Sequence, residues 1–198
     1  MNRRYLMTST IVAVFLIPAF VVGQETKKPA KASTGDKSAV EDIVFKVADD
    51  QIEMKASGTW KKVSPKSNIV EVEFAIPKQG SDENDGRMTI MSSGGTVEAN
   101  IDRWKGQFKN TDDDKVKVEK KTVNNLDVHV VDITGTFMDS MGGPAGPKTD
   151  RDNYRMLAAI VETKDNGLYF IKFYGPAETV GKNEPHFRSL IDSVKETK

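Results

Sequence analysis

The side chains available for chemistry in this 198-residue chain are carboxylates, hydroxyls, amines and two histidines, because the chain contains no cysteine. Asp127 and His129 lie two residues apart in a strand-like stretch, so both point to the same side. A carboxylate that orients an imidazole is the arrangement of hydrolytic triads, and Ser140 is the serine that would complete one. Ser140 lacks the sequence of a nucleophile elbow. We therefore interpret Asp127 and His129 as a surface pair, with a metal-assisted hydrolase as the alternative.

An acidic loop, SDENDG at residues 81–86, invites comparison with a calcium site. An EF-hand loop needs an acidic residue five positions before its glycine and a glutamate six positions after it. Ser81 and Ser92 occupy those positions, so we expect a solvated hairpin loop. The acidic run 112–114 has no ligand spacing either and is expected to be a solvated loop. No metal, cofactor or catalytic residue is predicted.

The longest expected irregular stretch is Met138 to Asp152, MDSMGGPAGPKTDRD. Its glycines form no phosphate-binding loop, because no Lys-Ser/Thr pair follows them at the required spacing. Loops of this length are often functional or disordered, and Met138 and Met141 could touch a soft metal or an apolar partner. We expect a mobile loop. As candidate partner or ligand surfaces we select Met138, Met141 and Arg151 here, and Asp102 and Arg103 on the outer face of a helix.

Charge and composition exclude several classes of function. The chain carries 29 basic and 29 acidic residues, whereas recognition of phosphate backbones needs a clustered positive surface. We therefore expect no nucleic-acid partner. The absence of cysteine excludes thiol nucleophiles, disulfides, iron–sulfur clusters and cysteine-ligated zinc.

The N-terminus has the pattern of a secretory signal. Arg3 and Arg4 precede an uncharged stretch from Tyr5 to Val22. We expect a signal peptide at residues 1–23 that is cleaved before Gln24, leaving no membrane span; the alternative is an uncleaved membrane anchor. Residues 24–39 contain almost no large apolar side chain and are expected to be a flexible linker. A single domain follows at residues 40–198, in the periplasm or outside the cell.

Strands dominate the expected domain. They are predicted at 43–47, 52–55, 60–63, 69–76, 87–91, 116–122, 126–137, 154–163 and 168–174. Stretch 69–76 has the period-two pattern of a half-buried strand. Asn124-Asn125 and Asp165-Asn166-Gly167 are predicted hairpin turns. Stretches 154–163 and 168–174 are apolar on both faces, which indicates central strands with Lys172 as their one charge.

Two amphipathic helices complete the prediction. Val97, Ile101, Trp104 and Phe108 form one apolar stripe, which predicts a helix over 96–109 with its tryptophan packed on the sheet. Trp60, Trp104 and Phe108 are interpreted as core rather than as an aromatic pocket. Phe187, Leu190, Ile191 and Val194 predict a final helix with Pro185 near its first turn. The fold class is therefore α+β, an antiparallel sheet with two packing helices.

The order of these elements resembles the Mog1/PsbP-like α/β/α sandwich, through GTWKKV, EVEFAIP, VEANIDRWKGQF and FRSLIDSV. From Trp60 to Val194 the chain also resembles small exported bacterial proteins of uncharacterised function, through NIDRWKGQF, VDITGTF, YRMLAAIVET and YFIKFYGPAETV. Such folds host photosystem accessory subunits and envelope proteins, so the resemblance implies a binding or accessory role. We expect a non-enzymatic exported domain that binds an envelope protein or a small ligand; a structural envelope component without a site is a further alternative.

Overall fold

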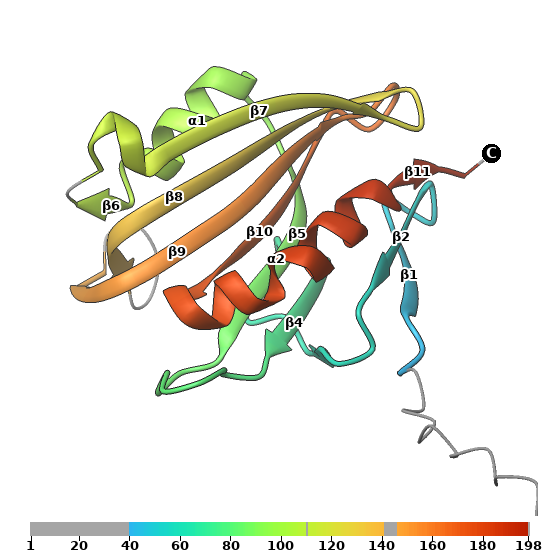
Figure 1. Cartoon of the computed structure of the whole chain (residues 1–198). Coiled ribbons are helices and arrows are strands. Elements are labelled where there is room, and N and C mark those ends of the chain that lie inside the picture. Colours follow the sequence, from blue (N-terminus) through green and yellow to red (C-terminus); the bar gives the residue numbers. More distant parts are fainter. Residues whose placement is uncertain (1–39, 110, 141–145, 198) are drawn as a thin grey trace, which may run out of the picture. The chain divides into compact units, whose positions relative to one another are not determined.

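A computed structural model describes residues 40–109, 111–140 and 146–197 of the chain (Figure 1). The expected signal peptide at 1–23 and linker at 24–39 lie outside the described residues. Within those described ranges, no helix is both long enough and apolar enough to cross a membrane.

The main structure is an antiparallel sheet of eight strands in the order β3-β4-β5-β10-β9-β8-β6, with β7 also paired to β8. Its strands are β3 (Lys61–Val63), β4 (Val72–Ile76), β5 (Gly86–Ser93), β6 (Phe108–Lys109), β7 (Val116–Val123), β8 (Leu126–Ser140), β9 (Lys148–Glu162) and β10 (Leu168–Pro176). A small sheet has the order β1-β2-β11. It contains β1 (Ile43–Val47), β2 (Ile52–Ala56) and β11 (Lys195–Glu196).

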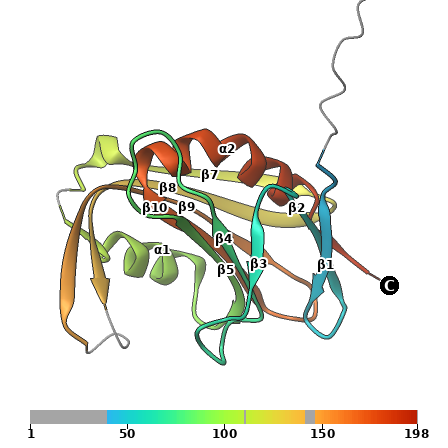
Figure 2. The same ribbon diagram turned by 90° about the horizontal axis from the view of Figure 1, so that it is seen from below.

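Two helices cover opposite faces of the eight-stranded sheet (Figure 2). They are α1 (Val97–Lys105) and α2 (Ala177–Asp192), and a short 3₁₀ turn, η1 (Asp113–Lys115), precedes β7. Each helix covers a separate hydrophobic core. Trp104 of α1 packs edge-on against Phe170, with ring centroids 5.2 Å apart, while Phe187 of α2 lies 6.3 Å from Phe173. The predicted α+β class with two packing helices is confirmed.

The central strands supply both cores because their successive side chains point to opposite faces. On β9, Met156, Ala158 and Ile160 lie in the α1 core, and Leu157, Ala159 and Val161 lie in the α2 core. Both predicted hairpin turns are also confirmed. Asn124 and Asn125 have φ of 49° and 66°, and Leu126 follows directly as the first residue of β8. Positive φ at both positions is the requirement of the turns that join tightly paired strands.

Helix α1 is shorter than predicted. It begins as expected after Thr96, whose hydroxyl accepts a hydrogen bond from the Ala99 amide at 3.2 Å, but it ends at Lys105 with Gly106 as its C-cap. Phe108 belongs to β6, where it pairs with Phe137 of β8. Phe108 stays in the α1 core, so the predicted packing of the apolar stripe on the sheet is confirmed. The helix end was wrong because sheet pairing replaces the helix after Gly106.

Helix α2 begins earlier than predicted. It starts at Ala177, directly after Pro176, so Pro185 lies inside the helix rather than near its first turn. Asp82 from the β4–β5 loop caps the start: its Oδ2 accepts hydrogen bonds from the Thr179 amide at 2.7 Å and the Thr179 hydroxyl at 2.6 Å. A distant carboxylate therefore replaces a local cap. The loop that the sequence predicts to be merely solvated holds the helix in place.

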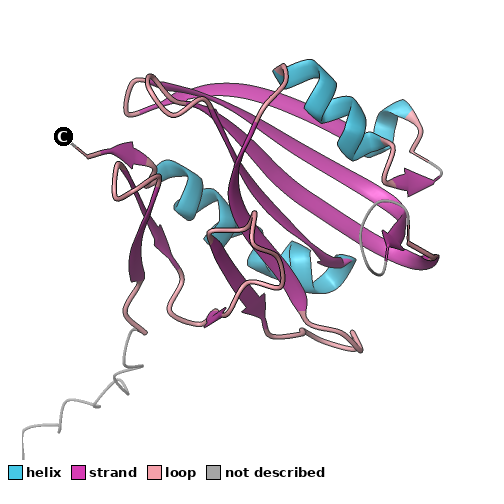
Figure 3. Ribbon diagram, turned by 180° about the vertical axis from the view of Figure 1, so that it is seen from behind, coloured by secondary structure: helices cyan, strands magenta, loops and turns pink. Residues whose placement is uncertain are grey.

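Strands β8 and β9 extend through most of the stretch expected to be a loop (Figure 3). Met138 pairs with Asp150, and Ser140 pairs with Lys148. The prediction of irregular structure over 138–152 is thus wrong for 138–140 and 148–152. The polar side chains here resemble a loop in composition, but cross-strand pairing with a neighbouring strand satisfies their backbone groups.

Strand β4 is more buried than its alternation predicts. Glu73 is 2% exposed although it occupies a polar position in the pattern. The Arg87 guanidinium makes two hydrogen bonds to it, at 2.8 and 2.9 Å. This pairing lowers the pKa of Glu73 and allows its carboxylate to remain charged inside the protein.

Candidate ligand-binding site

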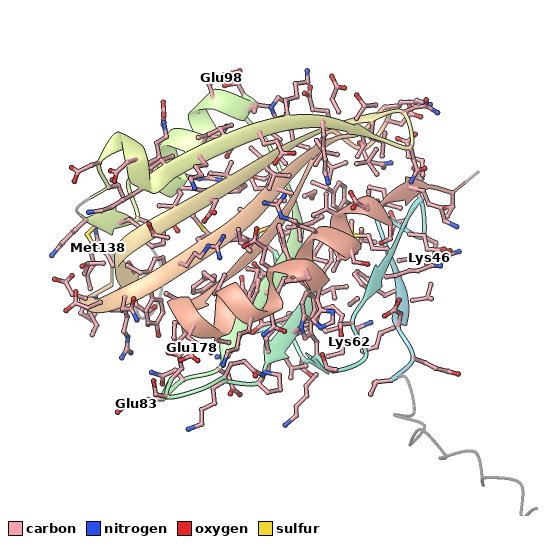
Figure 4. All side chains as sticks on the ribbon, in the orientation of Figure 1. Lys46, Lys62, Glu83, Glu98, Met138 and Glu178 are labelled. Carbon is pink, nitrogen blue, oxygen red and sulfur yellow. The ribbon has the colours of Figure 1, made fainter. Side chains whose placement is uncertain are left out.

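A pocket of about 350 Å³ opens where the end of α1 meets the ends of three long strands. This is within the size range of small-molecule sites. Met138, labelled at the left of Figure 4, marks its place in the fold. The lining comes from α1 and the turn after it, from β8, and from β9 and β10: Arg103, Gly106, Gln107, Phe137, Met138, Asp139, Ser140, Lys148 and Tyr174.

The position of the α1 wall is fixed by core packing and by the backbone. The buried Trp104 anchors the last turn of α1 against Phe170. After the helix, the Met138 amide donates a hydrogen bond to the Gln107 carbonyl at 2.8 Å, which joins this turn to β8. The wall is therefore held by contacts that do not themselves occupy the pocket.

A β-bulge shapes the strand wall. Gly135 pairs with Tyr154 and Phe137 pairs with Arg151, so one residue of β8 lies opposite two residues of β9. Asn153, one of those two, has φ of 55°. An extra residue reverses the side to which all following side chains point. The bulge consequently places Arg151 on the same face as Asp139, and its Nε lies 3.5 Å from the Asp139 carboxylate.

Gly135 allows the strand to pass close to β6. A Cβ at this position would lie 2.7 Å from the Lys109 carbonyl oxygen, and its φ is 155°. A side chain there would force the strands apart.

An aromatic pair forms the floor of the pocket. The rings of Phe137 and Tyr174 have centroids 5.0 Å apart. Behind them, the Lys172 ammonium lies 4.9 Å from the Tyr174 centroid and 5.7 Å from the Phe137 centroid. Gln107 accepts a hydrogen bond from it. Burial, with smaller contributions from Arg87 and Arg103, lowers the pKa of Lys172 to about 7.

The structure brings two of the predicted surface residues together. Arg103 and Met138 both line the pocket, and Arg151 lies against its Asp139 wall. Asp102 is exposed and lies 3.6 Å from Lys105 instead. Met141 lies outside the described residues. These placements define a pocket, and whether any of the five residues binds a partner stays a prediction.

The sequence predicts Arg103 on the outer face of α1, whereas its side chain points toward the sheet. Its guanidinium lies over the ring of Phe170, 5.8 Å from the centroid, which directs it toward the sheet. The sequence patterns do not place the lysines and the tyrosine at a site. Lys172 stands out only as the single charge in an apolar run, a pattern that marks a buried cation. Nothing in the local sequence of Lys148 or Tyr174 indicates a pocket.

The possible catalytic residues are not assembled. His129 Nε2 lies 2.7 Å from Glu162 rather than against Asp127, and Asp127 pairs with Lys120 at 2.8 Å. Ser140 lies at the far end of the same strand, β8, so it is about 36 Å from His129 at the ~3.3 Å rise per residue of a strand. A Ser140–His129–Asp127 triad is therefore excluded by geometry. No group of three potential metal ligands forms within the described ranges.

The two tryptophans lie in different cores. Trp60 is buried beneath α2, where its indole Nε1 donates to Asn183 at 2.9 Å, whereas Trp104 and Phe108 lie in the α1 core. The interpretation of all three as core residues is confirmed. The alternative of one shared aromatic pocket fails because the sheet separates them.

Comparison with solved structures supports the fold. The solution structure of cyanobacterial PsbP (CyanoP) from Synechocystis sp. PCC 6803 is similar to this chain with a TM-score of 0.51 and 14% identity, covering 83% of this chain and 98% of that one. The chain has a PsbP-like fold. A crystal structure of PA94, a protein of unknown function from Pseudomonas aeruginosa, aligns with a TM-score of 0.47 and 8% identity, over 80% and 99% of the two chains. The sequence matches no protein-family model and no curated protein.

A PsbP-like fold fixes the layers of this domain, but function depends on the site that a fold carries. The pocket at the end of α1 has an aromatic floor and two exposed cations in its walls, and a buried amine lies behind the floor. This combination is suited to binding a small molecule.

Proposed function

We propose that this protein is an exported, non-enzymatic binding domain of the bacterial envelope, and that its ligand site is the pocket at the end of α1. The observation that carries the proposal is the pocket itself: about 350 Å³, with an aromatic floor of Phe137 and Tyr174 and with Arg103 and Lys148 at its walls. Apolar surface with a few convergent polar groups is the usual composition of small-molecule sites.

Two further features support this function. The uncharged stretch after Arg3 and Arg4 favours export, and residues 24–39 would then tether or space the domain. The PsbP-like fold is compatible with an accessory role. In this proposal residues 1–23 are the signal peptide and residues 40–198 are the binding domain.

A pocket-filling variant provides the test. Gly106 has φ outside the left-handed region, and a Cβ there meets only backbone oxygens at 3.5 and 3.6 Å. Gly106→Leu therefore fits the backbone while adding bulk at the pocket wall. Gly94→Leu is the matched control, because a Cβ at Gly94 meets nothing within 4 Å and Gly94 lies before α1, away from the pocket.

The protein is expressed as the full chain, and the processed product is screened by thermal shift against chemically diverse small molecules. A ligand at 100 times its dissociation constant adds about 2.7 kcal/mol to stability. The proposal predicts stabilisation that Gly106→Leu abolishes and Gly94→Leu retains. Stabilisation that both variants retain, or a screen with no stabilising compound, would contradict it.

A further inference from the structure

The pocket carries an excess of positive charge. Arg103 and Lys148 line it and are both exposed. Among the described residues, no carboxylate lies within ion-pair distance of either one, whereas most other cations of the sheet have a partner, such as Arg87 with Glu73. Asp139, the one acidic side chain among the described lining residues, lies 3.5 Å from Arg151. Its charge is thus already compensated from outside the pocket.

Lys172 adds a third basic group behind the floor. The charged groups that act on it are Arg87 from β5 and Arg103 from α1, both positive. The side chains of β8, β10 and the turn after α1 that contact it are Phe137, Tyr174 and Gln107, all uncharged. Its cross-strand neighbours Thr89 and Ala158 are neutral too. An ammonium group in these surroundings has no counter-ion in the described structure, and burial of an unpaired charge is costly.

Ring stacking and charge together define the ligand. Phe137 and Tyr174 offer aromatic surface at the floor, where flat rings pack favourably. Arginine and lysine at the walls are the groups that proteins use to bind carboxylates and phosphates. Resting on the proposed function, we propose that the pocket binds a small aromatic oxyanion, whose ring packs on Phe137 and Tyr174 and whose charged group lies between Arg103 and Lys148.

Isothermal titration calorimetry with four simple probes tests the ligand class. Benzoate and phenyl phosphate carry both ring and charge, benzyl alcohol carries the ring alone, and acetate carries the charge alone. We expect benzoate or phenyl phosphate to bind at least tenfold more tightly than benzyl alcohol and acetate, since one charge-assisted contact corresponds to about tenfold in affinity. The stronger of the two anions identifies the carboxylate or phosphate form of the oxyanion.

Charge-removing variants locate the binding. Arg103→Gln and Lys148→Gln should each weaken binding of the preferred anion by about tenfold. Lys105→Gln is the matched control, because it removes a cation from the same helix that pairs with Asp102 rather than lining the pocket. The affinity of Lys105→Gln for this anion should stay within about twofold of that of the unaltered protein. Circular dichroism confirms that each variant is folded.

Protonation of Lys172 provides a second, independent measurement of anion binding. An anion bound at the pocket walls is separated from this amine by the two rings, but its charge still favours the protonated amine. Binding of benzoate near pH 7.5 should therefore be accompanied by proton uptake. Titrations in buffers with different heats of ionisation measure that uptake. Lys172→Met should abolish it.

The outcomes separate this inference from the proposed function. If benzyl alcohol binds as tightly as benzoate and phenyl phosphate, or if only neutral compounds show Gly106-dependent stabilisation, the oxyanion is wrong and the pocket remains a ligand site. If the anions bind but Arg103→Gln, Lys148→Gln and Lys105→Gln have equal effects, the proposed position of the charge is wrong. If no compound shows Gly106-dependent binding, both proposals fail.

Discussion

At the scale of single residues, the structure assigns roles to charges that the sequence shows only as composition. Lys172 is the one charge in an apolar run, and it lies behind two rings with no carboxylate of the described residues nearby. Arg155 is instead fully paired: it contacts Asp132 and Glu184, each at 2.7 Å, and so connects β9 and β8 with α2. The sequence indicates only that Lys172 is a lone charge in an apolar run; the neighbours of Lys172 and of Arg155 depend on elements that meet only in the folded domain.

Lys172 makes stability depend on pH. Its pKa is about 7 in the folded protein and about 10.4 in an unfolded chain, so between these values the unfolded state binds more protons and stability rises with pH. The destabilisation is complete below pH 7 and lost above pH 10.4. Lys172→Met should therefore stabilise the protein most at pH 6 and least at pH 10. Thermal unfolding at several pH values measures this; an equal gain at every pH would contradict the assigned protonation.

Arg155 should be important for stability. Its side chain is 17% exposed and that of Asp132 is 18% exposed, so Arg155→Met leaves a largely buried carboxylate without its partner. We expect a loss of about 3 kcal/mol in the free energy of unfolding, measured by urea denaturation. Lys182→Met is the control, since Lys182 and Glu178 form an exposed ion pair within α2. This pair should contribute less than about 1 kcal/mol to the free energy of unfolding. Equal losses of stability in the two variants would show that the Arg155 contacts contribute no more than an exposed ion pair.

At the scale of elements, local patterns predict strands and turns well and element ends poorly. The apolar runs of β9 and β10 and the Asn124-Asn125 turn can be recognised in the sequence because they depend on neighbours in the chain. The end of α1, the start of α2 and the extension of β8 and β9 depend on distant partners. These distant interactions are the pairing of Phe108 with β8, the capping of α2 by Asp82 and the bulge at Asn153. The pocket lies beside two of these features, the Phe108–Phe137 pairing and the bulge, so its lining could be predicted only in part.

Capping of α2 by Asp82 gives a prediction at this scale. Asp82→Ala removes the acceptor for both the amide and the hydroxyl of Thr179 and should cost about 1–2 kcal/mol, as lost N-caps do. Glu83→Ala is the matched control, because Glu83 is an exposed neighbour on the same loop (Figure 4). Urea denaturation compares the two variants. A loss in Glu83→Ala as large as that in Asp82→Ala would contradict a specific cap.

At the scale of the whole domain, one sheet separates two cores and also couples them. Phe170 lies in the α1 core and Phe173, three residues later on the same strand, lies in the α2 core. Since β9 and β10 contribute to both cores, neither core can lose its packing alone. The sequence predicts this arrangement through strands that are apolar on both faces. It does not predict which polar residues end beside the pocket, because their positions follow from the register of the whole sheet.

The two tryptophans report the two cores separately. Trp60→Phe leaves Trp104 as the probe of the α1 core, and Trp104→Phe leaves Trp60 as the probe of the α2 core. Within each single-tryptophan protein, adding Phe170→Ala or Phe173→Ala should lower stability by about 3–5 kcal/mol. In every case, the fluorescence and circular dichroism transitions should coincide, as for a two-state domain. Separate transitions would show that the cores unfold independently.

Binding of an aromatic oxyanion in the pocket at the end of α1 can be followed residue by residue with nuclear magnetic resonance. Amide chemical shifts are recorded while benzoate is added to the isotope-labelled protein. Binding there predicts saturable shifts concentrated at Gly106, Gln107, Ser140 and Tyr174, which line the pocket. Shifts concentrated instead around His129 and Glu162, or no saturable shift at all, would contradict it.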